Sequence, residues 1–241
     1  MCTQVCTGYV FQCSESEHVQ GVVGVQRHLP DALLLQEVWQ PKEAACIKDF
    51  VVSAIKTRQD RCGGGVAIYT HKNGKCVPLV KYDVDGLEAV WVEVMCNHVQ
   101  MTVGSVYIPP GEFQQMKLFG KQLRLVCAEN SNIIIGMDAN GRNLLWDDNL
   151  LVSQYGASRR MGDVLNEILD SNHLHILNDG RPTYITESSR SALDITAYKC
   201  NQPTKWKVVD DDIRSDHQVI ITLFTWTSPK RLTQFLTSVC C

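Results

Sequence analysis

One stretch of the chain reads Ile133-Ile134-Ile135-Gly136-Met137-Asp138-Ala139-Asn140. The β-branched run predicts a buried strand, and a carboxylate and a carboxamide follow where that strand stops. If strand geometry continues for two more residues, Asp138 and Asn140 point the same way. Asp138 can carry a charge or take a proton, and Asn140 can donate hydrogen bonds. The stretch therefore predicts a hydrolytic site at the end of a strand.

A second acidic motif lies further along the chain, where Ser215-Asp216-His217 leads into the apolar run Gln218-Val219-Ile220-Ile221. An Asp-His pair beside a strand can supply acid, base or metal-binding chemistry. Asp194 lies in an apolar context, Ala192-Leu193-Asp194-Ile195. Because an unpaired buried carboxylate is costly, we expect Asp194 to have a partner such as His217.

Two earlier strand ends carry further polar groups. Leu33-Leu34-Leu35-Gln36-Glu37 ends an apolar run in a carboxylate, and Glu37 is either an ordinary surface acid or a metal ligand. Val106-Tyr107-Ile108-Pro109-Pro110 ends a run in a phenol, and the prolines prevent further ladder pairing. Tyr107 either packs or donates a hydrogen bond to a phosphate oxygen.

The remaining pattern mixes strands with helices. Alternating or β-branched runs predict strands at 32–36, 65–70, 89–95, 101–107, 132–137 and 218–225. Helical spacing of apolar residues predicts helices at 17–29, 113–129 and 159–171. The 89–95 and 101–107 runs are a hairpin distance apart, so at least part of the sheet is antiparallel. The order predicts sheets covered by helices in layers.

Composition limits the class of protein. The chain has 241 residues, 44% of them hydrophobic, enough for one large domain, and no linker divides it. The N-terminus lacks a signal-peptide pattern and no apolar run spans a bilayer, so we expect an intracellular protein. The eleven cysteines include no Cys-x-x-Cys pair, which favours reduced core thiols over a zinc site. A net charge of -3 argues against strong non-specific binding to nucleic acids. Arginines cluster in the C-terminal half of the chain, so a local basic surface is still compatible with the sequence.

Taken in order, these motifs resemble the signature of the endonuclease/exonuclease/phosphatase family. The matching residues are Gln36-Glu37, Tyr107, Asp138-Ala139-Asn140, Leu193-Asp194 and Ser215-Asp216-His217. Five motifs in the same order are far more specific than any one. The match extends from Glu37 to His217, and it implies an α/β fold of the α+β kind, a four-layer α/β/β/α sandwich of two mainly antiparallel sheets covered by helices.

Several sequence motifs are similar to those of the apurinic/apyrimidinic-type endonuclease domain of LINE-type, non-LTR retrotransposons. They are Leu35-Gln36-Glu37-Val38-Trp39, Gly63-Gly64-Gly65-Val66-Ala67-Ile68-Tyr69, Val106-Tyr107-Ile108-Pro109-Pro110, Trp146 and Arg181-Pro182-Thr183-Tyr184. The resemblance implies a DNA endonuclease, dependent on Mg²⁺ or Mn²⁺, that nicks one strand and leaves a 3′-hydroxyl to prime reverse transcription. Acting on genomic DNA would require a nuclear location. We expect the domain to cover residues 1–228 and a tail to cover 229–241.

The resemblance also assigns roles to residues. The expected catalytic residues are Glu37, Tyr107, Asp138, Asn140, Asp194, Asp216 and His217, of which Glu37 and Asp216 are the expected metal ligands. The expected substrate-binding or positioning residues are Thr183, Ser215, Arg159, Arg160, Arg181 and Arg190. Either His217 or Asp138 takes the proton from the attacking water, and the sequence does not separate them.

One family position is missing. An Asn near the end of the first strand is usual, and the corresponding Gly8-Tyr9-Val10-Phe11-Gln12-Cys13-Ser14 contains none, so we expect a degenerate or truncated first strand. A catalytically weakened or dead retrotransposon remnant that only binds DNA or protein is therefore an alternative. A phosphatase on the same scaffold is another. No reverse transcriptase sequence follows His217, so we do not expect this chain to carry out retrotransposition alone.

Overall fold

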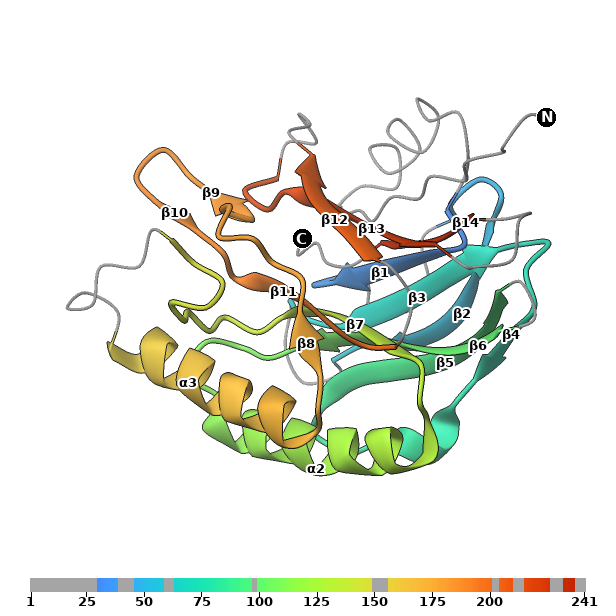
Figure 1. The fold of residues 1–241 in the computed structure, drawn as a ribbon, viewed down its shortest axis with the longest axis horizontal. Helices are drawn as coiled ribbons and strands as arrows, with labels where there is room; N and C mark the ends of the chain where they lie inside the picture. The colour runs from blue at the N-terminus through green and yellow to red at the C-terminus, as the bar shows by residue number, and fades with distance from the viewer. Residues whose placement is uncertain are drawn as a thin grey trace.

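The structure is a computed structural model, and it describes residues 30–38, 46–58, 63–96, 99–148, 156–200, 204–209, 215–225 and 232–236. In these residues two six-stranded sheets are stacked face to face, and two helices cover the outer face of one of them (Figure 1). The layers are therefore helix, sheet and sheet.

The first sheet has the strand order β12-β13-β14-β1-β3-β2. Its strands are β1 (Ala32–Gln36), β2 (Phe50–Lys56), β3 (Val66–His71), β12 (Thr204–Val209), β13 (Val219–Thr225) and β14 (Leu232–Leu236). β1 pairs antiparallel with β3 and parallel with β14, while β14 pairs antiparallel with β13. The C-terminal end of β1 and the N-terminal end of β13 consequently lie at the same end of this sheet.

The second sheet has the order β4-β5-β6-β7-β11-β8. Its strands are β4 (Cys76–Pro78), β5 (Glu88–Cys96), β6 (Val99–Tyr107), β7 (Ile133–Asp138), β8 (His175–Ile176) and β11 (Asp194–Lys199). β5 and β6 form the expected hairpin, and β6 and β7 are parallel. A 3₁₀ turn, η1 (Val80–Tyr82), precedes β5, and β9 (Tyr184–Ile185) pairs with β10 (Arg190–Ser191) as a separate ribbon.

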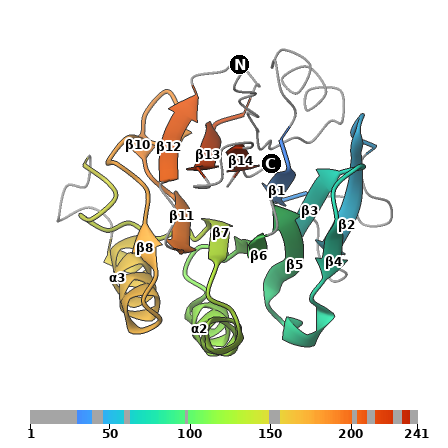
Figure 2. The same ribbon diagram turned by 45° about the vertical axis from the view of Figure 1, so that its right-hand side comes forward.

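The helices α2 (Phe113–Glu129) and α3 (Gly156–Ser171) lie side by side beneath the second sheet (Figure 2). Apolar residues recur at helical spacing in each, which gives a buried stripe on one face. The stripes consist of Met116, Phe119, Leu123 and Val126 in α2, and Met161, Leu165 and Leu169 in α3.

Alternation along β7 decides which residues face the other sheet. Ile133, Ile135 and Met137 pack in the cluster that contains the helices, whereas Ile134 packs in the cluster between the sheets. Successive strand residues point to opposite faces. Asp138 therefore points toward the first sheet, at the rim of the sandwich.

The α+β class and the two mainly antiparallel sheets agree with the sequence analysis, and α2 has the expected bounds. The expected helix at 17–29 and the stretch at 8–14 lie outside the described residues. The structure therefore does not test the expected fourth layer. β14 belongs to residues 229–241, which the sequence analysis set apart as a tail. This strand pairs with both β1 and β13, so the sheet extends beyond residue 228.

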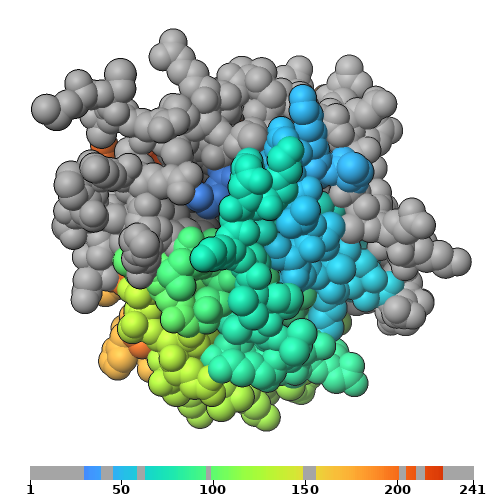
Figure 3. Space-filling model, turned by 90° about the vertical axis from the view of Figure 1, so that its right-hand side faces the viewer, coloured from blue at the N-terminus to red at the C-terminus, as the bar shows by residue number. Residues whose placement is uncertain are grey.

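At one side of the sandwich, β2 and β4 are the outer strands of the two sheets (Figure 3). A hollow of about 380 Å³ lies there, and its lining includes Val52, Ile55, Leu79 and Trp91. None of the candidate site residues lines this hollow. Among the described residues, no helix combines the length and apolar character needed to cross a bilayer.

Candidate active site

A row of four polar side chains crosses the second sheet. Glu88 in β5 is the direct partner of Tyr107 in β6, Tyr107 is the partner of Asp138 in β7, and Asp138 is the partner of Asp194 in β11. Directly paired residues on neighbouring strands share a face of the sheet. These four residues, the cross-strand row, are all buried. Three residues far apart in sequence that were expected at the site are therefore adjacent.

The first sheet contributes further polar residues to this site. Glu37 follows the end of β1, and Asp216 and His217 precede β13 at the same end of that sheet. Tyr184 forms an isolated antiparallel bridge with His217. The expected residues of both sheets thus meet at one rim of the sandwich.

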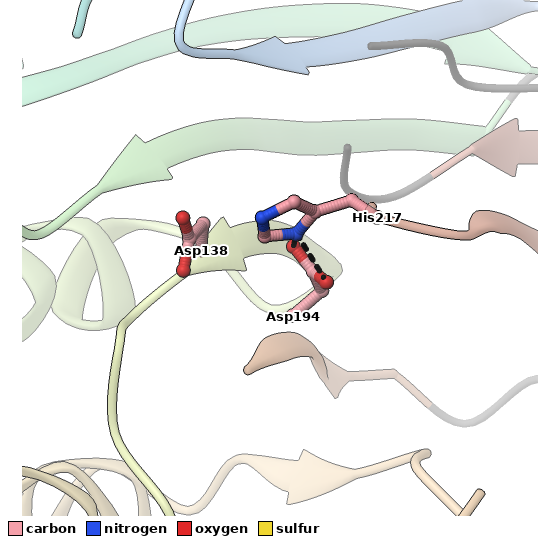
Figure 4. Close-up of side chains that lie close together, drawn as sticks. All are labelled: Asp138, Asp194 and His217. Atoms are coloured by element: carbon pink, nitrogen blue, oxygen red, sulfur yellow. Dashed lines mark hydrogen bonds and ion pairs between the residues drawn. The ribbon is translucent and has the colours of Figure 1, made fainter. Parts of the chain in front are cut away.

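A contact between His217 and Asp194 joins the two sides (Figure 4). His217 Nδ1 lies 2.9 Å from Asp194 Oδ2 and 3.1 Å from Asp194 Oδ1. The second ring nitrogen of His217 faces Asp138. Asp138, Asp194 and His217 each offer an atom within 4.8 Å of the others, close enough to hold one cation. The partner expected for Asp194 is the one found.

Electrostatics set the charge of His217. Burial disfavours the charged imidazole and would lower its pKa. The adjacent carboxylate of Asp194, with Asp138 and Glu37 further off, outweighs burial and raises the pKa of His217 to about 9. Without a cation in the site, His217 is therefore an imidazolium at neutral pH, and its Nδ1 donates to Asp194.

Tyr184 completes the surroundings of this imidazole. Its ring lies edge-on to that of His217, with 4.7 Å between the ring centroids. Burial, followed by the charges of Asp216 and Asp138, raises the pKa of the Tyr184 hydroxyl, while Arg142 opposes them. Sequence analysis quoted Tyr184 in a motif but gave it no role; its position next to Thr183 was the signal.

Asn140 holds the carboxylate of Asp138. The backbone N–H of Asn140 donates to Asp138 Oδ1 at 3.0 Å, and Asn140 Nδ2 donates to Asp138 Oδ2 at 3.2 Å and to the Ile108 carbonyl at 3.1 Å. Asn140 and Glu37 both have positive φ, 45° and 51°. Non-glycine residues seldom adopt this region, and such conformations cluster at functional sites.

Gln36 fastens the end of β1 to the second sheet. Its side chain is fully buried, and Nε2 donates to Ser105 Oγ at 2.8 Å and to the Gly136 carbonyl at 3.4 Å. Ser105 Oγ in turn donates to the Leu35 carbonyl at 2.9 Å. Since Glu37 follows Gln36 directly, these hydrogen bonds restrict the position of the Glu37 backbone. Ser105 was missed because a serine inside a strand carries no motif.

Thr183 and Ser215 support the Asp194–His217 pair. Thr183 is fully buried, and its hydroxyl accepts a hydrogen bond from the Asp194 N–H at 3.0 Å. Ser215 Oγ accepts from the His217 N–H at 3.2 Å. Both contacts are those of positioning residues, and Thr183 has no exposed surface for a substrate.

The four arginines expected to bind substrate are spread over α3, the segment before β9, and β10. Arg159 pairs with Asp163 at 3.0 Å, and Arg160 lies over the Phe113 ring at 5.8 Å. Arg181 pairs with Asp179 at 2.7 Å and lies over the Trp206 ring at 5.8 Å. Arg190 is exposed on β10. Carboxylates already offset two of these charges, so Arg160 and Arg190 are the better candidates for phosphate contacts.

The donor set suits a hard divalent cation. Glu37, Asp138, Asp194 and Asp216 are carboxylates, and three of them raise the pKa of the same imidazole. Mg²⁺ and Mn²⁺ prefer such oxygen ligands, and an excess of negative charge favours their binding. Glu37, Asp216 and His217 approach from the end of the first sheet, and Asp138 and Asp194 approach from the second sheet.

A family model described as endonuclease-reverse transcriptase matches residues 101–221, half of the 241-residue chain. The match includes Tyr107, Asp138, Asp194 and His217. No curated protein matches the sequence.

Several solved structures share the fold. The endonuclease domain of TRAS1, a telomere-specific non-LTR retrotransposon, superposes with a TM-score of 0.71 at 19% identity, over 93% of this chain and 100% of that domain. An AP endonuclease from Archaeoglobus fulgidus gives 0.64 at 12% identity, over 92% and 100%. An inositol polyphosphate 5-phosphatase domain, in complex with inositol (1,4)-bisphosphate and calcium, gives 0.56 at 13% identity, over 96% and 84%. At these identities the likeness concerns the fold.

Proposed function

Because the chain belongs to the endonuclease-reverse transcriptase family, within the endonuclease/exonuclease/phosphatase proteins, we propose that it is a divalent-metal-dependent DNA endonuclease. It hydrolyses one phosphodiester bond in one strand and leaves a 3′-hydroxyl that can prime reverse transcription. Action on genomic DNA implies a nuclear location. The observation that carries the proposal is the Asp138–Asp194–His217 cluster at the end of the cross-strand row.

In this proposal Glu37 and Asp216 would hold a divalent cation at the end of the first sheet. A bound Mg²⁺ or Mn²⁺ would act as a Lewis acid toward the scissile phosphate. The strained backbone at Glu37 and the buried Gln36 bonds support this, because both restrict where that carboxylate lies. A pre-positioned ligand loses less conformational entropy on binding.

Asp138 and His217 have different roles. Asp194 holds His217 through Nδ1, which leaves the second ring nitrogen directed into the site. There the imidazole stabilises negative charge on the phosphate. Asp138, on the facing side and held by Asn140, takes the proton from the attacking water. Tyr107 donates a hydrogen bond to a phosphate oxygen. Asn140, expected to do the same, already donates to Asp138 and to the Ile108 carbonyl, so its role here is to hold Asp138. The hydroxyls of Thr183 and Ser215 keep Asp194 and His217 in place.

Nicking of a supercoiled plasmid in the presence of Mg²⁺ tests the function. An endonuclease converts the supercoiled form to the open circle, and DNA polymerase then extends the nick if its 3′ end is a hydroxyl. A catalytically dead remnant would bind DNA in a gel shift without nicking it. A phosphatase, for which the inositol phosphatase fold is the supporting observation, would release phosphate from a phosphomonoester and leave the plasmid supercoiled.

A further inference from the structure

A buried ion pair lies beside the site, at the end of the cross-strand row that the mechanism does not use. Arg58 Nε donates to Glu88 Oε1 at 2.6 Å, and Nη2 lies 2.5 Å from the same oxygen. Nη2 has no hydrogen bond of good geometry, so the contact is held through Nε. The side chains are only 13% and 8% exposed. Because desolvation offsets most of the attraction in a buried pair, stability alone is a weak reason for its presence.

Three consecutive glycines wrap around this pair. Gly63, Gly64 and Gly65 have φ of 87°, 72° and 87°, a region that side chains rarely adopt. A Cβ on Gly64 would lie 2.5 Å from both Arg58 Cζ and Glu88 Oε2. The glycine run is therefore needed where the backbone passes the ion pair.

The same loop connects the pair to the first sheet. Glu88 Oε2 accepts a short hydrogen bond from the Gly65 N–H. The Gly65 carbonyl accepts one from the Val38 N–H at 3.3 Å, and Val38 directly follows Glu37. Glu88 thus contacts the loop that borders the end of β1.

The pair also contacts the row. Glu88 and Tyr107 are direct partners between β5 and β6. The Arg58 guanidinium lies over the Tyr107 ring, 5.4 Å from its centroid. A cation at this distance is attracted to the face of an aromatic ring. Tyr107 is therefore contacted on the face of its ring by Arg58, and Glu88 binds Arg58.

We propose that Arg58 and Glu88 are positioning residues for the Tyr107 hydroxyl. The inference rests on the proposed function, in which that hydroxyl donates to a phosphate oxygen. Arg58 holds the ring by its face, Glu88 holds the guanidinium, and the glycine run leaves room for both. Neither Arg58 nor Glu88 touches the phosphate.

The test is a double-mutant cycle in the plasmid assay. Arg58→Met/Glu88→Gln removes both charges together and so leaves no unpaired buried charge. Tyr107→Phe removes the hydroxyl and keeps the ring. Because a misplaced group costs up to about 100-fold in rate, we expect each change to lower kcat by about tenfold. Combined, they should also lower kcat by about tenfold, because without the hydroxyl there is nothing left to position.

The matched control is Lys81→Met/Glu129→Gln, which removes an exposed ion pair elsewhere and should leave kcat unchanged. An additive loss of about 100-fold in the combined variant, or wild-type kcat in Arg58→Met/Glu88→Gln, would overturn the inference. If the wild-type protein does not nick DNA, the proposed function fails instead. A crystal structure of Arg58→Met/Glu88→Gln then decides: a displaced Tyr107 ring supports positioning, and an unmoved ring overturns it.

Discussion

Gln36 Nε2 donates a hydrogen bond to Ser105 Oγ at 2.8 Å across the space between the two sheets. The two residues are 69 positions apart, and both are fully buried. Ser105 lies two residues before Tyr107 and Gln36 directly precedes Glu37, so one bond relates two expected site residues on different sheets. Gln36 is thus a positioning residue for both sides of the site.

Gln36→Leu should destabilise the protein and slow nicking. The variant keeps the volume of the side chain and leaves the Ser105 hydroxyl with one partner fewer, at a cost of about 1–3 kcal/mol. Urea denaturation measures the free energy of unfolding, and initial nicking rates measure activity. Gln114→Leu on the outer face of α2 is the control and should change neither. Unchanged rates in Gln36→Leu would show that Glu37 is held by other contacts.

Asp138→Ala, His217→Ala and Glu37→Ala should each lower the nicking rate by about 10²- to 10⁴-fold, the range for a lost catalytic group. Each substitution removes a polar group at the rim and little core volume. Circular dichroism should show a folded protein in every case. His175→Ala, on β8 and outside the cluster, is the control for a lost imidazole. A variant that nicks at the wild-type rate removes that residue from the mechanism.

Chelation should stop the reaction, because the carboxylate donors are expected to hold a divalent cation. EDTA should abolish nicking, and excess Mg²⁺ or Mn²⁺ should restore it. The melting temperature should also rise with added Mg²⁺, since a ligand of the native state stabilises it. That rise should be absent in Glu37→Gln/Asp216→Asn. Undiminished cleavage in excess chelator contradicts a metal-dependent mechanism.

In metal-free protein, an NMR titration of His217 should have its midpoint at about pH 9 instead of its ordinary 6.5. The folded-state pKa lies above the unfolded one, so the Asp194 contact stabilises the fold fully below pH 6.5, and this is lost as the pH rises through about 9. Asp194→Asn removes the charge that raises the pKa of His217 most, whereas the burial that lowers this pKa remains. The titration midpoint of His217 should therefore fall sharply in this variant. A midpoint near 6.5 in wild-type protein would contradict the ion pair.

Local patterns were enough to predict much of the fold. The β-branched runs gave β1, β3, β5, β6, β7 and β13, and apolar spacing gave α2 with its observed bounds. Periodicity works here because each element buries one face or is buried on both. β2, β4, β8, β9, β10, β11, β12 and β14 were not predicted as strands. β2 has exposed apolar residues at Val51, Val52 and Ile55 and contains a bulge at Val52/Ala54, and both features disturb its alternation.

The kinds of chemical group at the site, and their order along the chain, are sequence properties, because strand ends expose polar residues that would be costly inside. The register that aligns Glu88, Tyr107, Asp138 and Asp194 is set only when four strands pair, since a shift by one residue would turn each side chain to the opposite face. The sequence alone also does not determine the protonation state of His217. It depends on burial and on carboxylates from both sheets, whose effects on a pKa oppose each other and can be weighed only at known distances.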